Sequence, residues 1–324
     1  MKHLFAAVAL AATVLGSGSA AAQDYPSRTV TIVLPFAAGG PTDALARIVA
    51  ERMRASLGQP VIIENVAGAA GTVSIGRVVR SAPDGYTLSL GPWNSHVVTG
   101  AVYNLQFDLL TDLEPVALLA TNHSVIVSKA AVPAKTLQEL IAWVKANQDK
   151  VSAGTSGVGA ATHIGGIVFQ TMTKTQFAFV PYRGAGPAMQ DLVAGQIDLM
   201  FDQISNSLPQ VKGGQIRPYA VMAKTRSAAL PDVPTVDEAG LPGFYLAVWH
   251  GLWAPKGTPK DVIAKLNKAV VETLADASVR QRLAELGQEV TPTGQQSPEA
   301  LRAYHKAEVD KWWPVIKAAN IKAQ

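Results

Sequence analysis

The hydrophobic positions of the chain follow two alternating patterns, which predict strands and helices in turn. Residues 29–34 are apolar and β-branched, as is typical of a buried strand. After a glycine-rich loop, apolar residues recur at helical spacing over 45–57, with Thr42 or Asp43 placed to cap the helix and Gly58 to end it. The first unit is therefore a strand, a glycine-rich loop and a helix.

The same unit recurs along the chain. Strands are predicted at 60–64, 86–90, 151–153 and 179–181, and helices follow them at 72–81, 162–172 and 187–194, with a further helix at 136–147 and a strand at 196–202. Strands that alternate with helices through short connections are typical of parallel sheets, so we expect an α/β fold.

Extended segments interrupt this alternation twice. Residues 114–120 and 124–127 form the first interruption, and residues 244–253 form the second, after which three helices complete the chain. We expect the chain to cross between two domains at these two places.

The first 22 residues have the three parts of a secretory leader. Lys2 and His3 precede an apolar run of about a dozen residues, and small residues then lead to Ala22. Such a run is shorter than the roughly 20 residues that span a bilayer, so we expect cleavage after Ala22 and a freely soluble, periplasmic protein. An uncleaved amphipathic N-terminal helix is the alternative.

Composition excludes several classes of function. The formal charge of +4 is spread along 324 residues without a basic run, which argues against nucleic-acid binding. With 48% hydrophobic and 16% charged residues, the chain can build a large core. The absence of cysteine removes disulfides, thiolate metal sites and cysteine nucleophiles.

Two groups of residues suggest catalysis. The run Gly154-Thr155-Ser156-Gly157-Val158 resembles a nucleophile elbow, but its fifth position is valine instead of glycine. A secreted hydrolase that uses Ser156 and His163 is therefore the alternative function. Asp198 and Asp202 lie on one side of a predicted strand, although two carboxylates at this spacing are weak support for acid–base chemistry.

Neither a cofactor nor a metal is expected. The six histidines show no pair at helical ligand spacing, and no cysteine could join them. Residues 157–162 lack the third glycine of a dinucleotide-binding loop, and the chain has no Gly-Lys-Ser/Thr phosphate-binding sequence.

Glycine-rich loops at the carboxyl ends of strands suit an anion better. Those around 37–43 and 67–72 belong to the first half of the chain, and the loop at 155–162 belongs to the second. Loops of this type direct backbone N–H groups and a helix N-terminus outward, which favours a bound carboxylate. We therefore expect an anion between two lobes, although such loops are also common as ordinary turns of α/β proteins.

Seven motifs, taken in order, resemble those of one family, the substrate-binding proteins of tripartite tricarboxylate transporters, often called Bug receptors. The resemblance covers essentially the whole chain after the leader. The motifs are Tyr25-Pro26, Pro35 to Asp43, Asn65 to Gly71, Pro83 to Leu88, Val180 to Gly184, Gly195 to Asp198 and Ala254 to Pro259.

The resemblance implies a two-lobed periplasmic-binding-protein type II fold. Two βα-rich domains would be joined by a hinge of two crossovers and would close on a ligand. Domain I would comprise 23–122 and 250–324, domain II would comprise 123–249, and the ligand cleft would lie between them.

The resemblance also implies the binding residues. The loop Pro35 to Asp43 would hold one carboxylate through backbone groups, and Thr155 to His163 would close over the other end with the turn at Tyr182. Ser156 and Ala160 depart from the family pattern, and Arg183 could act only by shaping its turn. The expected ligand-binding set is Phe36, Ala37, Ala38, Gly39, Gly40, Thr42, Asp43, Ala67, Gly68, Trp93, Ser95, Thr155, Ser156, Gly157, Gly159, Thr162, His163, Tyr182, Arg183, Gly184 and Asp202.

In this set Trp93 would wall the cleft, unless it serves ordinary packing. The implied function is a receptor without catalytic activity. It would capture a small carboxylate, such as a dicarboxylate, a tricarboxylate, an aromatic acid or an acidic amino acid. It would act as a monomer and deliver the ligand to a transporter with one large and one small membrane subunit.

Overall fold

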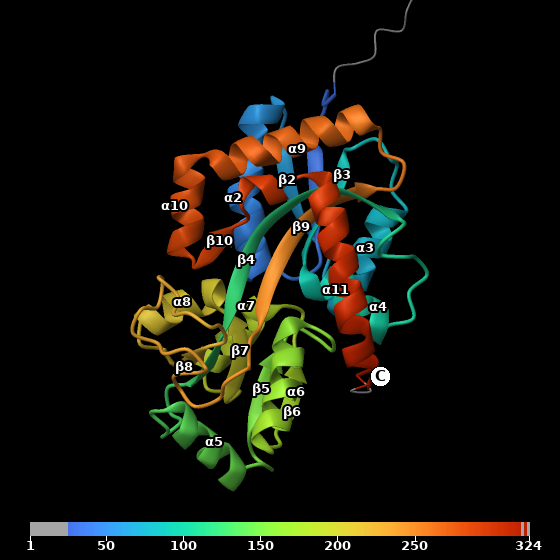
Figure 1. Ribbon diagram of the computed structural model, residues 1–324. Helices are drawn as coiled ribbons and strands as arrows, with labels where there is room; N and C mark the ends of the chain where they lie inside the picture. Colours follow the sequence, from blue (N-terminus) through green and yellow to red (C-terminus); the bar gives the residue numbers. More distant parts are fainter. Residues whose placement is uncertain (1–24, 319–320, 323–324) are drawn as a thin grey trace, which may run out of the picture.

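The computed structural model describes residues 25–318 and 321–322, so the expected leader at 1–22 lies outside the described residues. The chain forms two lobes connected by two long strands, β4 (Leu113–Lys129) and β9 (Ala247–Pro255), which run from one lobe toward the other (Figure 1). The expectation of a two-lobed α/β fold with two crossovers is confirmed.

The first lobe combines the N-terminal and C-terminal parts of the chain. Its strands are β1 (Val30–Leu34), β2 (Val61–Asn65), β3 (Thr87–Pro92) and β10 (Gln288–Val290). Its helices are α2 (Pro41–Leu57), α3 (Thr72–Val79), α4 (Thr99–Val102), α9 (Lys260–Ala275), α10 (Ala277–Glu285) and α11 (Pro298–Ala318), with short helical turns η1 (Ala69–Gly71), η2 (Asn94–Val98) and η3 (Thr293–Gln295).

The second lobe is built from the middle of the chain. Its strands are β5 (Ser152–Thr155), β6 (Ala178–Pro181), β7 (Leu199–Gln203) and β8 (Ile216–Val221). Its helices are α5 (Leu137–Ala146), α6 (Ala161–Thr173), α7 (Ala185–Val193) and α8 (Ile204–Lys212).

The strands form one continuous hydrogen-bonded order, β2-β1-β3-β9-β4-β7-β5-β6, with β8 and β10 also paired to β4. Pairs within each lobe, such as β1 with β2 and β5 with β6, are parallel, as the βαβ pattern predicts. The pairs that involve β9 and β4 are antiparallel. Parallel strands place the carboxyl-end loops of each lobe at one edge of its sheet.

The first crossover differs from its expected form. Residues 114–120 and 124–127 were predicted as separate segments, but they belong to the single 17-residue strand β4. Its backbone pairs with β9 as far as His123 and with β7 from Ser124 onward, so the polar residues in its middle do not end the strand. Asn122 supports this change of partner, because its amide donates to the Gly287 carbonyl and accepts from the Ser205 N–H.

Three buried clusters stabilise this arrangement. One packs the first sheet against α2, α9 and α10, and another packs the second sheet against α7 and α8. The largest includes residues of both lobes and of β9, among them Trp93, Phe201 and Trp253. The lobes therefore have separate cores on one side and a shared apolar connection along the hinge strands.

The start of α2 also differs from its prediction. The helix begins at Pro41, whose fixed φ suits a first helical position, and Gly40 is the N-cap. Thr42 and Asp43, predicted as caps, lie inside the first turn instead. The predicted end is confirmed, because Gly58 closes the helix in the left-handed conformation with φ 69°.

Candidate functional site

The first-lobe loop at 36–43 is held in shape by the carboxylate of Asp43. This carboxylate accepts from the Gly39 N–H at 3.1 Å, from the Arg47 guanidinium at 2.9 and 3.0 Å and from the Asn65 amide at 3.1 Å. Burial opposes ionisation of Asp43, but these hydrogen bonds outweigh it and lower the pKa of the carboxyl group. Asp43 therefore organises the loop and is not free to act as a proton donor.

The same loop is tied to the hinge. The Thr42 hydroxyl lies 3.2 Å from Nε2 of His250, which is a buried residue of β9. Burial lowers the pKa of His250 to about 3, so its imidazole is neutral at pH 7. The first-lobe loop and the hinge strand β9 thus share one buried hydrogen bond.

The second-lobe loop after β5 is held by its own side chains. The Thr162 hydroxyl accepts from the Ser156 N–H at 2.8 Å, and the Thr155 hydroxyl accepts from the Gly157 N–H at 3.3 Å. Nδ1 of His163 accepts from the Gly159 N–H at 3.1 Å. Burial lowers the pKa of His163 to about 4. His163 is thus a neutral residue that fixes the loop, and the described contacts give it no bond to Ser156.

The two lobes touch in this conformation. The Ala37 N–H of the first lobe donates to the Arg183 carbonyl of the second at 3.0 Å, and the Tyr103 hydroxyl donates to the Val158 carbonyl at 2.9 Å. At Gly186, an added Cβ would lie 2.9 Å from the carbonyl carbon of Gly39, closer than real Cβ contacts. The structure is therefore of the closed form, and the closeness of the lobes depends on small residues.

Between the closed lobes lies a cavity of about 20 Å³. Seven of the expected ligand-binding residues line it: Phe36, Ala37, Gly40, Thr42, Asp43, Ser156 and Thr162. Seven further residues line it that are not in the expected set: Pro41, Pro92, Asn94, Ala160, Ala161, Ala185 and Gln203. A cavity of this size holds about one water molecule, so the lobes must separate to admit a larger ligand.

Several other expected residues belong to loops that meet across the cleft but do not line the cavity. The backbone of Ala38 and Gly39 lies against Gly186, and Gly184 lies against the backbone of the cavity residue Ala37. The loop that contains Ala67 and Gly68 continues to Ala70, which approaches Gly157, and Gly159 approaches Val102. Thr155 and His163 support the second loop as described above.

Trp93 and Ser95 lie away from the cavity. The Trp93 side chain is 1% exposed and packs edge-on against Trp312 of α11, with ring centres 4.8 Å apart. The Ser95 hydroxyl donates to the Pro92 carbonyl and lies 2.9 Å from His96 Nδ1. Of the two roles considered for Trp93, the structure shows packing.

The remaining expected residues of the second lobe act through local contacts. The Tyr182 hydroxyl donates to Asp191 at 2.6 Å, and Arg183 reaches the first lobe through its carbonyl while its side chain is exposed. Asp202 is fully buried, accepts from Asn206 and Ser207, and has its pKa raised to about 7 because burial disfavours its charge. Asp198 bonds instead to Ser152 and Lys129, so the two carboxylates do not form a pair.

Helices α2, α6 and α7 begin at this cavity without a side-chain cap. Helix α8 begins there as well, with Gln203 as its N-cap, but its Ser205 N–H donates to the Asn122 side chain. The N-caps of α2, α6 and α7 are Gly40, Ala160 and Gly184, and no described side chain accepts a hydrogen bond from the first N–H groups as a cap. The N–H groups of these first turns, for which no capping side chain is present, and the positive end of each helix dipole thus converge from both lobes. This arrangement favours a negatively charged ligand.

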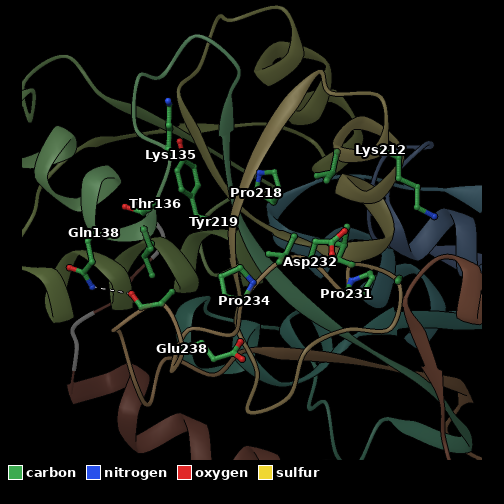
Figure 2. A pocket seen from close by; sticks show the side chains of 16 residues that line it. Lys135, Thr136, Gln138, Lys212, Pro218, Tyr219, Pro231, Asp232, Pro234 and Glu238 are labelled. Atoms are coloured by element: carbon green, nitrogen blue, oxygen red, sulfur yellow. Dashed lines mark hydrogen bonds between the residues drawn. The ribbon is translucent and has the colours of Figure 1, made fainter.

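A larger cavity of about 860 Å³ lies elsewhere, on the second lobe (Figure 2). It is lined by residues between 135 and 239, among them Lys135, Pro218 and Pro234. The Tyr219 hydroxyl at its wall already bonds to Ser128 and to the Ala134 carbonyl. This cavity contains none of the expected site residues.

The described residues show two absences that concern other classes of protein. None of the described helices combines the length and the apolar character needed to cross a membrane. Within the same part of the chain, no three His, Asp or Glu residues gather closely enough to hold a metal ion.

Two lobes that close over a cavity at the N-termini of three helices define a solute-binding protein of the periplasmic-binding-protein type II class. The chain belongs to the tripartite tricarboxylate transporter family of receptors, whose profile matches residues 45–321. The resemblance found in the motifs is thus confirmed.

Solved structures agree with this assignment. The periplasmic binding protein BugD is 41% identical, with a TM-score of 0.89 over 92% of this chain and 100% of BugD. MatC from Rhodopseudomonas palustris, solved with malate, is 40% identical, with a TM-score of 0.87 over 90% and 100% of the two chains. Rpa4515 of R. palustris, solved with adipate, is 33% identical, with a TM-score of 0.87 over 93% and 100%.

Proposed function

We propose that this protein is a periplasmic receptor that captures a small carboxylate between its lobes and delivers it to a tripartite transporter. The observation that carries the proposal is the set of uncapped N-termini of α2, α6 and α7, which meet at one cavity from two lobes. Such groups bind a carboxylate without a cationic side chain. The malate and adipate bound by the two relatives support the same class of ligand.

Capture follows from the closed geometry. In the proposed cycle, domain I (23–122 and 250–324) and domain II (123–249) separate about β4 and β9, admit the ligand and close again. Closure restores the bond between Ala37 and Arg183 and excludes water, which strengthens the hydrogen bonds to the ligand. The receptor then carries the ligand without chemical change, and we propose no catalytic role for Ser156 or His163.

Export and delivery complete the proposal. Cleavage after Ala22 would release the receptor as a monomer into the periplasm, where the closed form would dock on the large and small membrane subunits. Mass spectrometry of the protein from the periplasm tests the first part, with Gln23 expected as the first residue. An intact Met1 would contradict cleavage.

The binding test is a titration of the purified protein with a panel of carboxylates, followed by calorimetry and thermal unfolding. The panel contains aliphatic dicarboxylates of different length, citrate, acidic amino acids and aromatic acids, each paired with its uncharged methyl ester or amide. A ligand at 100 times its Kd should raise the free energy of unfolding by about 2.7 kcal/mol. We expect at least one acid to bind and its uncharged partner to fail, because only the charged form matches the helix N-termini. Equal binding of acids and esters would contradict the proposal.

A further inference from the structure

Two side chains that face the cavity from opposite lobes have unpaired amide atoms. Asn94 begins η2 after strand β3, and Gln203 ends strand β7 at the start of α8. The two residues are 2% and 8% exposed. Asn94 Nδ2 and Gln203 Oε1 are buried and find no hydrogen-bond partner among the described residues.

Their neighbours along the chain differ. The Ser95 hydroxyl is bonded to the Pro92 carbonyl, and the Asn206 amide is bonded to Asp202 and to the Ala185 carbonyl. Other buried atoms of these segments, Trp93 Nε1, Asp202 Oδ1 and Ser205 Oγ, also find no partner among the described residues, but their residues do not line the cavity. Asn94 and Gln203 line it and have unpaired atoms.

A buried amide without a partner lowers stability, so a closed receptor gains if the ligand supplies the missing hydrogen bonds. This step rests on the proposed function, in which the helix N-termini hold the carboxylates of the ligand. The amides are then left to contact the part of the ligand between or beside its carboxylates. A plain methylene chain has no group to offer them.

We propose that the ligand carries a hydroxyl or amino group on its carbon chain, and that Asn94 and Gln203 recognise this group from the two lobes. A hydroxyl both donates and accepts, and each amide also offers both, so the match holds for either orientation of the amide planes. The relatives leave this choice open, because malate has a hydroxyl group and adipate has none. The unpaired amides favour the substituted class for this chain.

The test compares matched acids that differ only in the substituent. Calorimetry of the purified protein gives the Kd for succinate, malate and aspartate, and for glutarate and 2-hydroxyglutarate. One unpaired buried group corresponds to a factor of about ten in affinity, so the preferred substituted acid should bind at least tenfold more tightly than the unsubstituted acid of the same length.

Two variants then identify the residues that read the substituent. Gln203→Met and Asn94→Leu replace each amide by an apolar group of similar size. In each we expect the preference to fall below about threefold, with binding of the unsubstituted acid retained or improved. The exposed residue Gln295 provides the matched control, since Gln295→Met should keep the full preference. Thermal unfolding of each variant verifies the fold.

The outcomes separate the two proposals. If acids bind but the substituted and unsubstituted members of each pair bind equally, the inference is wrong and the receptor function stands. A preference that survives in both variants would also overturn it, because the substituent would be read elsewhere. If no carboxylate binds at all, the proposed function itself fails.

Discussion

Helices α2, α6 and α7, which begin at the cavity, differ from α5, α10 and α11, which begin elsewhere, although α3 and α9 also begin away from the cavity without a side-chain cap. Away from the cavity, α5 is capped by the Thr136 hydroxyl, which accepts from the Glu139 N–H, and α11 by the Ser297 hydroxyl, which accepts from the Ala300 N–H. At the cavity, the N-caps of α2, α6 and α7 are glycine or alanine and have no capping side chain.

In the proposed function, stability is given up at these helix starts for binding. A side-chain cap contributes about 1 kcal/mol to a helix. Three helices lack that contribution at the cavity, where in the proposed function a carboxylate supplies the missing acceptor. The chain forms such caps on α5 and α11, and in the proposed function a bound carboxylate acts as a shared cap for the three helices at the cavity.

The strongest test of this comparison fills the cavity. Gly40→Trp places an indole ring at the uncapped start of α2, where an added Cβ already lies 3.5 Å from the Gly186 backbone nitrogen. We expect ligand affinity to fall more than about 100-fold, or about 3 kcal/mol. Calorimetry measures the loss, and circular dichroism should show an unchanged fold.

Gly294→Trp is the matched control, because Gly294 lies where an added Cβ meets nothing within 4 Å. This variant should bind as the original protein does. Unaltered binding in Gly40→Trp would place the ligand outside this cavity.

Low pH tests the buried histidines, one of which, His250, is hydrogen-bonded to the first turn of the uncapped helix α2. Thr42 in its first turn is hydrogen-bonded to buried His250, whose pKa is lowered to about 3, and buried His305 has its pKa lowered to about 4. The unfolded chain takes up these protons near pH 6.5, while the folded chain does so only near pH 3 to 4.

The folded state therefore loses stability as the pH falls below about 6.5. At pH 5 the expected loss relative to pH 7.5 is about 2 kcal/mol for each of the two imidazoles. His163, with its pKa lowered to about 4, adds a similar loss, whereas Asp202, with its pKa raised to about 7, offsets about one imidazole. Urea unfolding at both pH values measures it. A free energy of unfolding that stays constant between them would contradict the assignment of neutral, buried histidines.

A capping side chain can also be introduced at one of the uncapped helices of the cavity. Ala160→Asp gives α6 a carboxylate that accepts from its own first N–H groups, because the N-cap backbone already has the extended conformation that caps adopt. We expect about 1 kcal/mol more stability without ligand, and about tenfold weaker binding of a carboxylate. Calorimetry and urea unfolding measure the two effects.

Thr136→Ala provides the reverse experiment at a helix away from the cavity. It should lower the free energy of unfolding by about 1 kcal/mol and leave ligand affinity unchanged. If Ala160→Asp bound ligand as tightly as the original chain, the N–H groups of α6 would have no part in binding.

The smallest effect is expected at the contact between the lobes. Gly186→Ala adds a methyl group that would lie 2.9 Å from the Gly39 carbonyl carbon, but only in the closed form. We expect ligand affinity to fall several-fold with little change in the stability of the protein without ligand. Gly40→Ala, whose Cβ would make an ordinary 3.5 Å contact, should weaken binding less. Equal effects of the two variants would indicate that closure is looser than the structure shows.

Much of this fold could be predicted because its signals are local. The β-branched run at 29–34, the left-handed Gly58 and the glycine-rich loops each report the conformation of their own few residues. The position of the first crossover could be predicted from the sequence. That its two segments form the single strand β4 could not, since only the change of pairing partner from β9 to β7 shows it.

The site was less predictable for the same reason. Phe36, Gly40 and Thr162 could be found because their loops have recognisable compositions. Asn94 and Gln203 could not, since no motif marks them, and their unpaired amides are apparent only when both lobes surround them.

By itself, the sequence determined the alternation of strands and helices, the small residues at the helix starts and the family. Backbone conformation and helix capping depend on neighbours in the chain, so the local sequence is enough to predict them. The tertiary structure alone decided that Trp93 packs on α11, that His163 holds its loop, and that two amides from different lobes share one cavity. Such relations depend on the direction and burial of side chains brought together from distant segments, and only packing fixes these.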